Sequence, residues 1–227
     1  DNSNVNDGAT VDVGTSLYDT ATITGVTPNA GGQVVYKAYP NGSCTAGTEV
    51  FTSATLTMTN GVIPNSGSFV FATAGTYEWQ VSYAGDANNS PATSTCGTET
   101  VIVAKKDTSI TTVMKTGAGA TIADNSSILV PFSMYDTATL SGGTANAGGS
   151  VTYNLYTNTD CSGTLAFTSG PHTVTNGVVP NSGTTPATAA VIHNWQVVYT
   201  GDASNKGSTS GCGTETVYGQ VQPSITT

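Results

Sequence analysis

The chain has 227 residues and a formal net charge of −9 at pH 7, with five Lys and Arg against fourteen Asp and Glu. Only 8% of the residues are charged, whereas an ordinary soluble domain has about 25%. So few basic residues cannot form a phosphate-binding surface, which excludes nucleic acid as a partner. No apolar run approaches the roughly 18 residues of a membrane-spanning helix, so we expect no membrane insertion in this segment.

Two copies of one segment follow each other along the chain. The offset between them is 117 residues for the earliest motif and 116 for later ones, and a repeat of this length is a domain. We therefore expect a first domain at 1–105 and a second at 106–221. The recurring motifs are YDTAT at 18–22 and 135–139, PNSG at 64–67 and 180–183, and CGTETV at 96–101 and 212–217.

The predicted elements are β-strands throughout. In the best example Tyr77, Trp79, Val81 and Tyr83 alternate with polar residues, which predicts a strand with one buried face and the tryptophan in the core. Glycine, proline and Asn-Gly turns separate the strands, and no stretch has sustained helical periodicity. The fold class is therefore all-β, with two antiparallel sandwiches of about seven strands each. Strands of the first copy are expected at 33–39, 68–71, 77–83 and 100–103.

The two ends of the chain are out of phase with the repeat. The segment 108–114 predicts the first strand of the second copy, but nothing comparable precedes the first copy. The start of that strand returns at the end of the chain. One interpretation is an excised piece of a longer array. The other is a subunit whose tail completes a neighbour's sheet by strand addition. The tail residues are Ser224, Ile225, Thr226 and Thr227.

One recurring turn resembles a known family. The sequences YAGDAN at 83–88 and YTGDAS at 199–204 resemble the Tyr-x-Gly-Asp ending of bacterial immunoglobulin-like repeat domains. The lead-in AGTY at 74–77 is also similar, although the second copy has VIH at 191–193 instead. The resemblance implies tandem immunoglobulin-like modules of large secreted surface proteins, often adhesins.

Each copy contains two cysteines at matching positions. One pair per copy indicates a disulfide within each domain and an oxidising compartment. A zinc site is not favoured, because there is no C-x-x-C spacing and no histidine common to both copies. The expected disulfides join Cys44 to Cys96 and Cys161 to Cys212.

An acidic residue recurs on an otherwise apolar strand face in each copy. A buried carboxyl group is costly unless it is protonated or hydrogen-bonded, so we expect a polar cluster around it. The arrangement resembles adhesin domains that form an internal Thr–Gln ester between first and last strands, although Glu stands here where Gln is expected. A hydrogen-bonded cluster is the other interpretation. The candidate residues are Thr111, Thr112, Asp136 and Glu215, with Asp19 and Glu99 in the first copy.

Two further ligand classes have candidate residues. Calcium needs six to eight oxygen ligands. The turns at 86–89 and 202–205 supply oxygens, with Asp1, Asp7 and Asp12 nearby in sequence, but a turn that hydrogen-bonds its own backbone is the alternative. N-glycosylation triplets begin at Asn41, Asn88 and Asn125.

No catalytic constellation recurs between the copies, so we expect no enzyme. The leading prediction is a structural module of an extracellular cell-surface fibre or adhesin stalk, whose partners are neighbouring domains or copies of itself. The first alternative is a pilus-like filament subunit that donates its C-terminal strand. The second is a carbohydrate-binding module that contacts host or surface glycans through exposed tyrosines such as Tyr39 and Tyr156.

Overall fold

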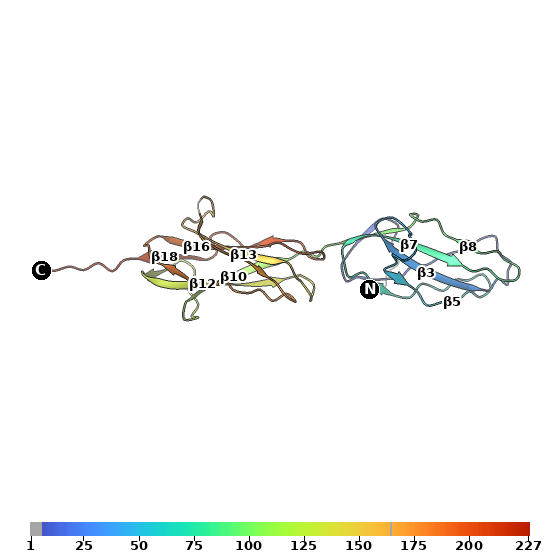
Figure 1. Cartoon of the computed structure of the whole chain (residues 1–227), viewed down its shortest axis with the longest axis horizontal. Coiled ribbons are helices and arrows are strands. Elements are labelled where there is room, and N and C mark those ends of the chain that lie inside the picture. Colours follow the sequence, from blue (N-terminus) through green and yellow to red (C-terminus); the bar gives the residue numbers. More distant parts are fainter. Residues whose placement is uncertain (1–5, 164) are drawn as a thin grey trace. The chain divides into compact units, whose positions relative to one another are not determined.

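A computed structural model describes residues 6–163 and 165–227 of the chain (Figure 1). The described residues form β-strands, turns and irregular segments, and none of them is helical. The chain divides into two compact units, Asp1–Lys105 (unit 1) and Lys106–Thr227 (unit 2). This division falls between the same two residues as the boundary between the sequence repeats.

In unit 1 the larger sheet has the order β1-β9-β7-β3-β4, with β5 paired to β3 and β8 paired to β7. In the described residues of this unit the smaller sheet consists of β2 and β6. The strands are β1 (Ala9–Asp12), β2 (Ser16–Leu17), β3 (Gln33–Pro40), β4 (Phe51–Thr52), β5 (Leu56–Thr57), β6 (Phe69–Val70), β7 (Gly75–Tyr83), β8 (Ala92–Thr93) and β9 (Thr100–Ala104).

In unit 2 the larger sheet has the order β11-β18-β16-β13-β14, with β17 paired to β16. The smaller sheet has the order β10-β12-β15. The strands are β10 (Ser109–Thr116), β11 (Ser126–Leu129), β12 (Phe132–Ser141), β13 (Ser150–Tyr156), β14 (Leu165–Thr173), β15 (Thr185–Ala187), β16 (Ile192–Tyr199), β17 (Ser208–Thr209) and β18 (Thr216–Gln220).

One pair of strands in each unit is parallel, which corrects the prediction of purely antiparallel sheets. β1 runs parallel to β9, and β11 runs parallel to β18. The sequence pattern could not predict this, because the alternation of side chains is the same in both kinds of sheet. In unit 2 the chain passes from β10 in the smaller sheet to β11 in the larger one, so it reaches both sheets before β12 begins.

Each unit has its own core, enclosed by its two sheets. In unit 2 Ile110 and Met114 of β10 pack in one cluster with Val197 and Tyr199 of β16. The tryptophans lie in these cores as predicted, with Trp79 4% exposed and Trp195 0% exposed. Burial of these large side chains provides most of the stabilisation of each unit.

The segment after β2 differs between the units. Asp19 was expected to lie on a strand, but residues 18–24 have no strand structure, whereas the matching residues in unit 2 belong to β12. In unit 2 this segment pairs with β10 along its whole length. The described part of unit 1 has no strand in the position of β10, since β1 corresponds to β11. Without a partner for its backbone groups, the segment 18–24 does not form a strand.

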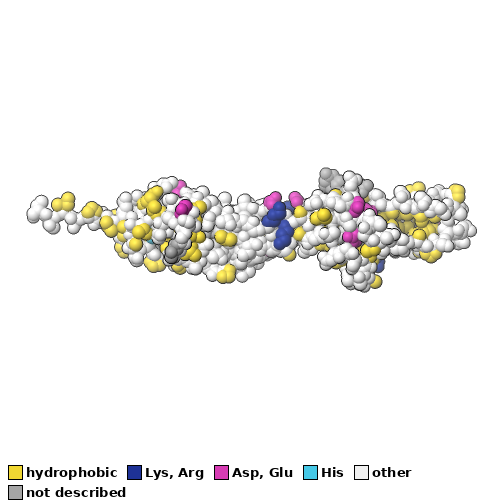
Figure 2. All heavy atoms as spheres, turned by 90° about the horizontal axis from the view of Figure 1, so that it is seen from above, with side chains coloured by type: hydrophobic (Ala, Val, Ile, Leu, Met, Phe, Trp, Pro, Cys, Tyr) yellow, Lys and Arg dark blue, Asp and Glu magenta, His cyan; other side chains and the backbone are white. Residues whose placement is uncertain are grey.

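The surface is polar but little charged. In the face shown in Figure 2, charged side chains are few and most visible atoms belong to neutral polar groups or to the backbone. Within the described residues, no helix is long and apolar enough to span a bilayer.

Candidate functional site

Unit 2 contains a buried pair of carboxyl groups from Asp136 of β12 and Glu215, the residue before β18. Asp136 is 0% exposed and Glu215 is 8% exposed, and neither carboxyl oxygen of Asp136 nor Glu215 Oε2 has a hydrogen-bond partner among the described residues. Because two neighbouring buried carboxylates repel each other, the pair is more stable when one of them carries a proton. Burial, and then the charge of Glu215, raises the pKa of Asp136 to about 9. The pair therefore keeps one proton at neutral pH.

The first strand of unit 2 determines which carboxyl group carries the charge. The backbone N–H of Met114 donates to Glu215 Oε1 over 2.6 Å, and the side chain of Thr112 lies close to Glu215. Burial raises the pKa of Glu215, but these two neighbouring donors oppose the rise because they favour the ionised form. Glu215 is therefore the ionised member and Asp136 is the protonated one.

The recurring PNSG motif holds the backbone of the buried aspartate. In unit 2 the N–H of Asp136 donates to Ser182 Oγ over 2.8 Å, and the N–H of Ser182 donates to the carbonyl of Asp136 over 3.0 Å. Unit 1 repeats both bonds between Asp19 and Ser66, over 2.8 Å and 2.9 Å. The motif therefore recurs because it fixes this segment in place.

Unit 1 has the corresponding pair, Asp19 and Glu99, but its glutamate is less buried than that of unit 2. Asp19 is 3% exposed, and its Oδ1 atom has no hydrogen-bond partner among the described residues. Burial, and then the charge of Glu99, raises the pKa of Asp19 to about 8. Glu99 is only half-buried, because no strand of the described residues occupies the position of β10 beside it. The carboxyl pair of unit 1 is thus the same cluster without its first strand.

The predicted Thr–Asp–Glu cluster is brought together only in part. Thr112 contacts Glu215, but Thr111 is exposed on the opposite face of β10, as the alternation of a strand requires. Including Thr111 in the cluster was therefore wrong. An internal ester stays a prediction, and its atoms would come from Thr112 and Glu215.

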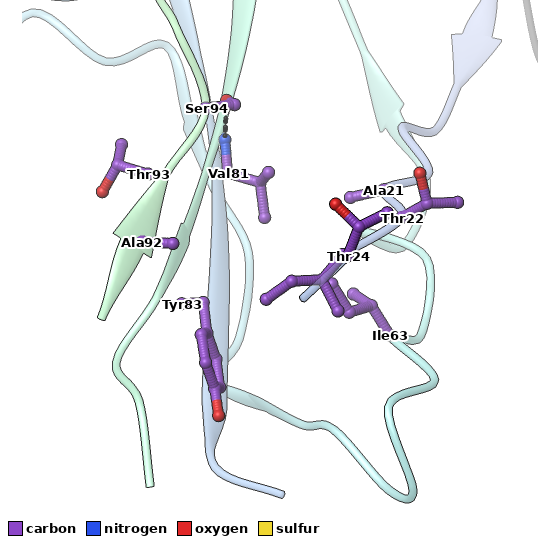
Figure 3. A pocket seen from close by; sticks show the side chains of 10 residues that line it. Ala21, Thr22, Thr24, Ile63, Val81, Tyr83, Ala92, Thr93 and Ser94 are labelled. Carbon is purple, nitrogen blue, oxygen red and sulfur yellow. Dashed lines mark hydrogen bonds between the residues drawn. The ribbon is translucent and has the colours of Figure 1, made fainter. Parts of the chain in front are cut away.

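A groove of about 270 Å³ opens in unit 1 beside residues 21–24, which follow the buried Asp19 (Figure 3). One wall is formed by residues 21–24 and Ile63, and the other by Val81, Tyr83 and residues 92–94. None of these residues is charged. Val81 is half-buried here, whereas its counterpart in unit 2, Val197, is 0% exposed.

In unit 2 the same position is filled by the start of β10. Ser109 pairs with Ser141 and Ile110 pairs with Leu140, across the segment that corresponds to 21–24. Ile110 is only 5% exposed because it packs into the core. The groove of unit 1 is therefore the space that a first strand occupies in unit 2.

The tail of the chain repeats the sequence of that first strand. Residues 224–227 have the sequence SITT, which is also the sequence of residues 109–112. In the structure residues 221–227 form no strand and extend away from unit 2 (Figure 1). Ile225 is 93% exposed, so the side chain that would occupy a core lies in solvent.

Both predicted disulfides are formed, Cys44 with Cys96 and Cys161 with Cys212. Each disulfide lies within one unit, and its two cysteines are 52 residues apart in the sequence of unit 1 and 51 residues apart in unit 2. Disulfides of this kind indicate an oxidising environment.

The candidate calcium turns are occupied by protein donors. Asp86 accepts hydrogen bonds from the backbone N–H groups of Gly31 and Asn88, each over 2.8 Å. These bonds lower the pKa of Asp86 to about 2 and attach the turn to the recurring NAGG motif at 29–32. Asp1 lies outside the described residues. Among the described residues no group of three or more His, Cys, Asp or Glu side chains could hold a metal ion.

The remaining candidates are surface positions, with one exception. Asn41, Asn88 and Asn125 are all exposed, as glycosylation would require. Tyr156 is half-buried, but Tyr39 is only 3% exposed, so its prediction as an exposed sugar-binding residue was wrong. Its cross-strand partner Glu78 is 4% exposed as well, so the outer face of the sheet is covered at this point.

Sequence reasoning did not identify the residues that line the groove, but it predicted from two signals that the tail could complete a neighbour's sheet. One was the missing counterpart of β10 in the first copy, and the other was the SITT sequence of the tail. A scan against models of known protein families finds no match for this chain, and a search of curated proteins finds no similar sequence.

Proposed function

We propose that the chain is a non-enzymatic structural module of an extracellular cell-surface fibre or adhesin stalk, built from two immunoglobulin-like β-sandwiches. The observation that carries the proposal is that the recurring motifs are used for internal support. The PNSG serines hold the buried aspartates, and the Asp86 and Asp202 turns hold the NAGG segments. Residues shared by both copies therefore stabilise the fold, which is what a repeated structural module needs.

The strand arrangement supports a load-bearing role. In unit 2 β11 and the last strand, β18, are parallel neighbours, and β1 and β9 have the same relation in unit 1. Tension that pulls two such strands apart along their length loads all of their hydrogen bonds together. Each disulfide also prevents the chain between its two cysteines from extending. The two cysteines are 52 residues apart in unit 1 and 51 residues apart in unit 2.

Force spectroscopy of single molecules tests the mechanical part of this proposal. Reducing a disulfide should add about 180 Å of extensible chain per unit, from roughly 3.6 Å per residue. A variant with Cys161→Ala and Cys212→Ala should show the longer extension for unit 2 without reductant, and unit 1 of the same molecule is the control. The oxidised, folded chain should unfold at forces higher than those that extend an unfolded, reduced chain. Equal forces would contradict a load-bearing role.

Surface labelling tests the location. Antibodies against the chain, applied to intact source cells and followed by immuno-electron microscopy, should label fibres or stalks outside the cell. Label found only inside permeabilised cells would overturn the proposal.

A second candidate function is favoured by the groove and the tail together. In this case the chain is a subunit of a pilus-like filament, and the exposed residues 224–227 join one subunit to the next. The observation in its favour is that a groove without a strand and an exposed strand sequence occur in one chain.

A further inference from the structure

We propose that residues 224–227 of one copy of this chain occupy the groove of unit 1 in another copy, as the first strand of that unit's smaller sheet. The inference rests on the second proposed function, filament assembly, and names the junction: the donor segment, the acceptor groove and the register between them.

Unit 2 is the template for this register. There Ser109, Ile110, Thr111 and Thr112 pair antiparallel with Ser141, Leu140, Thr139 and Ala138. The offset of 117 residues carries the β12 partners to 24, 23, 22 and 21 in unit 1. Since the donor segment has the same sequence as 109–112, Ile225 should lie opposite Ile23 and Thr226 opposite Thr22.

The chemistry of the groove matches that of the donor. Neither residues 224–227 nor the residues that line the groove have charged side chains. Ile225 is 93% exposed in the single chain, whereas Ile110 in the template position is 5% exposed. Docking would bury Ile225 between Ile63 and Val81, which line the groove.

The buried carboxyl pair provides a polar contact at the other end of the donor. In unit 2 the N–H of Met114 in β10 donates to Glu215 Oε1 over 2.6 Å, and the side chain of Thr112 lies close to Glu215. The matching residues at the junction are Thr227 and Glu99. Glu99 is half-buried and is not covered by a first strand in unit 1. The hydroxyl group of Thr227 would therefore lie close to Glu99, as that of Thr112 lies close to Glu215 in the template.

The tail and the linker leave unit 2 at opposite ends of β16, so the proposed donor is the tail of another copy. The N–H of Lys106 donates to Ser204 O near the end of β16. By contrast, Gly219 of β18 donates to Val191 O before the start of β16. The eight residues of β16 span about 26 Å. The seven residues 221–227 reach at most about 25 Å, which is less than the length of β16.

Such a contact is heterologous, since the groove and the tail are different surfaces. Head-to-tail contacts of this kind form open filaments when the rotation between copies does not close a ring. Within one chain, β9 is followed by the linker and then by β10, the first strand of unit 2. The tail repeats this order, because the SITT sequence of β10 returns after β18.

Assembly of the full chain tests the proposal. Light scattering and negative-stain electron microscopy should show oligomers that lengthen with concentration. Ile225→Asp should weaken the association by about 10- to 100-fold, because an isoleucine side chain would no longer be buried. Val221→Asp is the matched control, since Val221 is also exposed, at 66%, but precedes the donor segment. Equal assembly of both variants, or a wild-type chain that stays monomeric, would overturn the proposal.

Cysteine cross-linking tests the register. The four native cysteines are all paired, so single added cysteines report cleanly. Mixing a Thr22→Cys chain with a Thr226→Cys chain should give a disulfide-linked dimer. Thr20→Cys, which is also exposed but two residues out of register, should cross-link at least ten times more slowly. Equal rates, or no cross-link at Thr22, would overturn the junction. Fibres that persist without this cross-link would leave the structural role intact, so the two proposals can fail separately.

Discussion

Replacing Asp136 by Asn should change how the stability of unit 2 depends on pH. Asp136 is 0% exposed, and burial followed by the charge of Glu215 raises its pKa from 3.8 to about 9. An asparagine has nearly the same shape, and its amide is a neutral group beside Glu215, as the protonated carboxyl group is. The variant therefore keeps the contact but removes the ionisation.

The sign and size of the effect follow from proton binding. Between pH 3.8 and about 9 the folded state keeps the proton on Asp136 and the unfolded state loses it. Wild-type stability therefore falls with rising pH through this window, by about 1.4 kcal/mol per pH unit from this group. The stability of the Asp136→Asn chain does not fall in this way, because the asparagine does not ionise. Relative to wild type it should gain about 4 kcal/mol between pH 5 and pH 8.

Urea unfolding followed by tryptophan fluorescence measures this difference. Each unit contains one buried tryptophan, so Trp79→Phe in both proteins restricts the signal to Trp195 of unit 2. Burial lowers the pKa of His193, which makes wild-type stability rise with pH in the acidic range, but this contribution cancels in the difference. A difference between the two proteins that stays constant from pH 5 to pH 8 would refute the reasoning. So would wild-type stability that increases from pH 7 to pH 8.

Three other substitutions test the internal supports. Ser182→Ala should destabilise unit 2 by about 1–3 kcal/mol, because a buried backbone N–H loses its acceptor; an unchanged urea midpoint would contradict this. Removing the disulfide with Cys161→Ala and Cys212→Ala should cost on the order of 4 kcal/mol, and the thermal melt of the variant should no longer respond to reductant. Gly149→Ala should cost more than about 1 kcal/mol, since an added Cβ would lie 2.2 Å from Gly201 O at a φ of +79°. Native-like circular dichroism and an unchanged melting temperature would count against that clash.

The internal repeat made the interior of the fold predictable from sequence. A residue kept in both copies is under the same physical demand twice, so Trp79 and Trp195 could be assigned to the cores. The burial of Asp19 and Asp136 followed from their place on an apolar strand face. Strand period and recurrence were sufficient here, because both depend on local sequence.

The remaining features depend on contacts between distant segments. Residues 18–24 have the sequence of a strand, but a strand also needs a partner, and only unit 2 provides one in β10. The parallel pairing of β1 with β9 leaves no trace in side-chain alternation. Tyr39 has the alternation of an outward residue, yet it is buried where the outer face is covered. Each miss concerns what lies beside a strand, which period alone does not specify.

The low charge of the chain bears directly on the proposed junction. Sheet edges in soluble proteins are usually protected by charged side chains, lysine above all, which prevent a further strand from pairing. With five Lys and Arg in 227 residues, this chain has few such residues, and residues 21–24 at the open edge of unit 1 include none. The corresponding edge in unit 2 is equally uncharged, but β10 covers it. An unprotected edge would favour non-specific aggregation unless a defined strand occupies it, and the tail has the sequence of that strand.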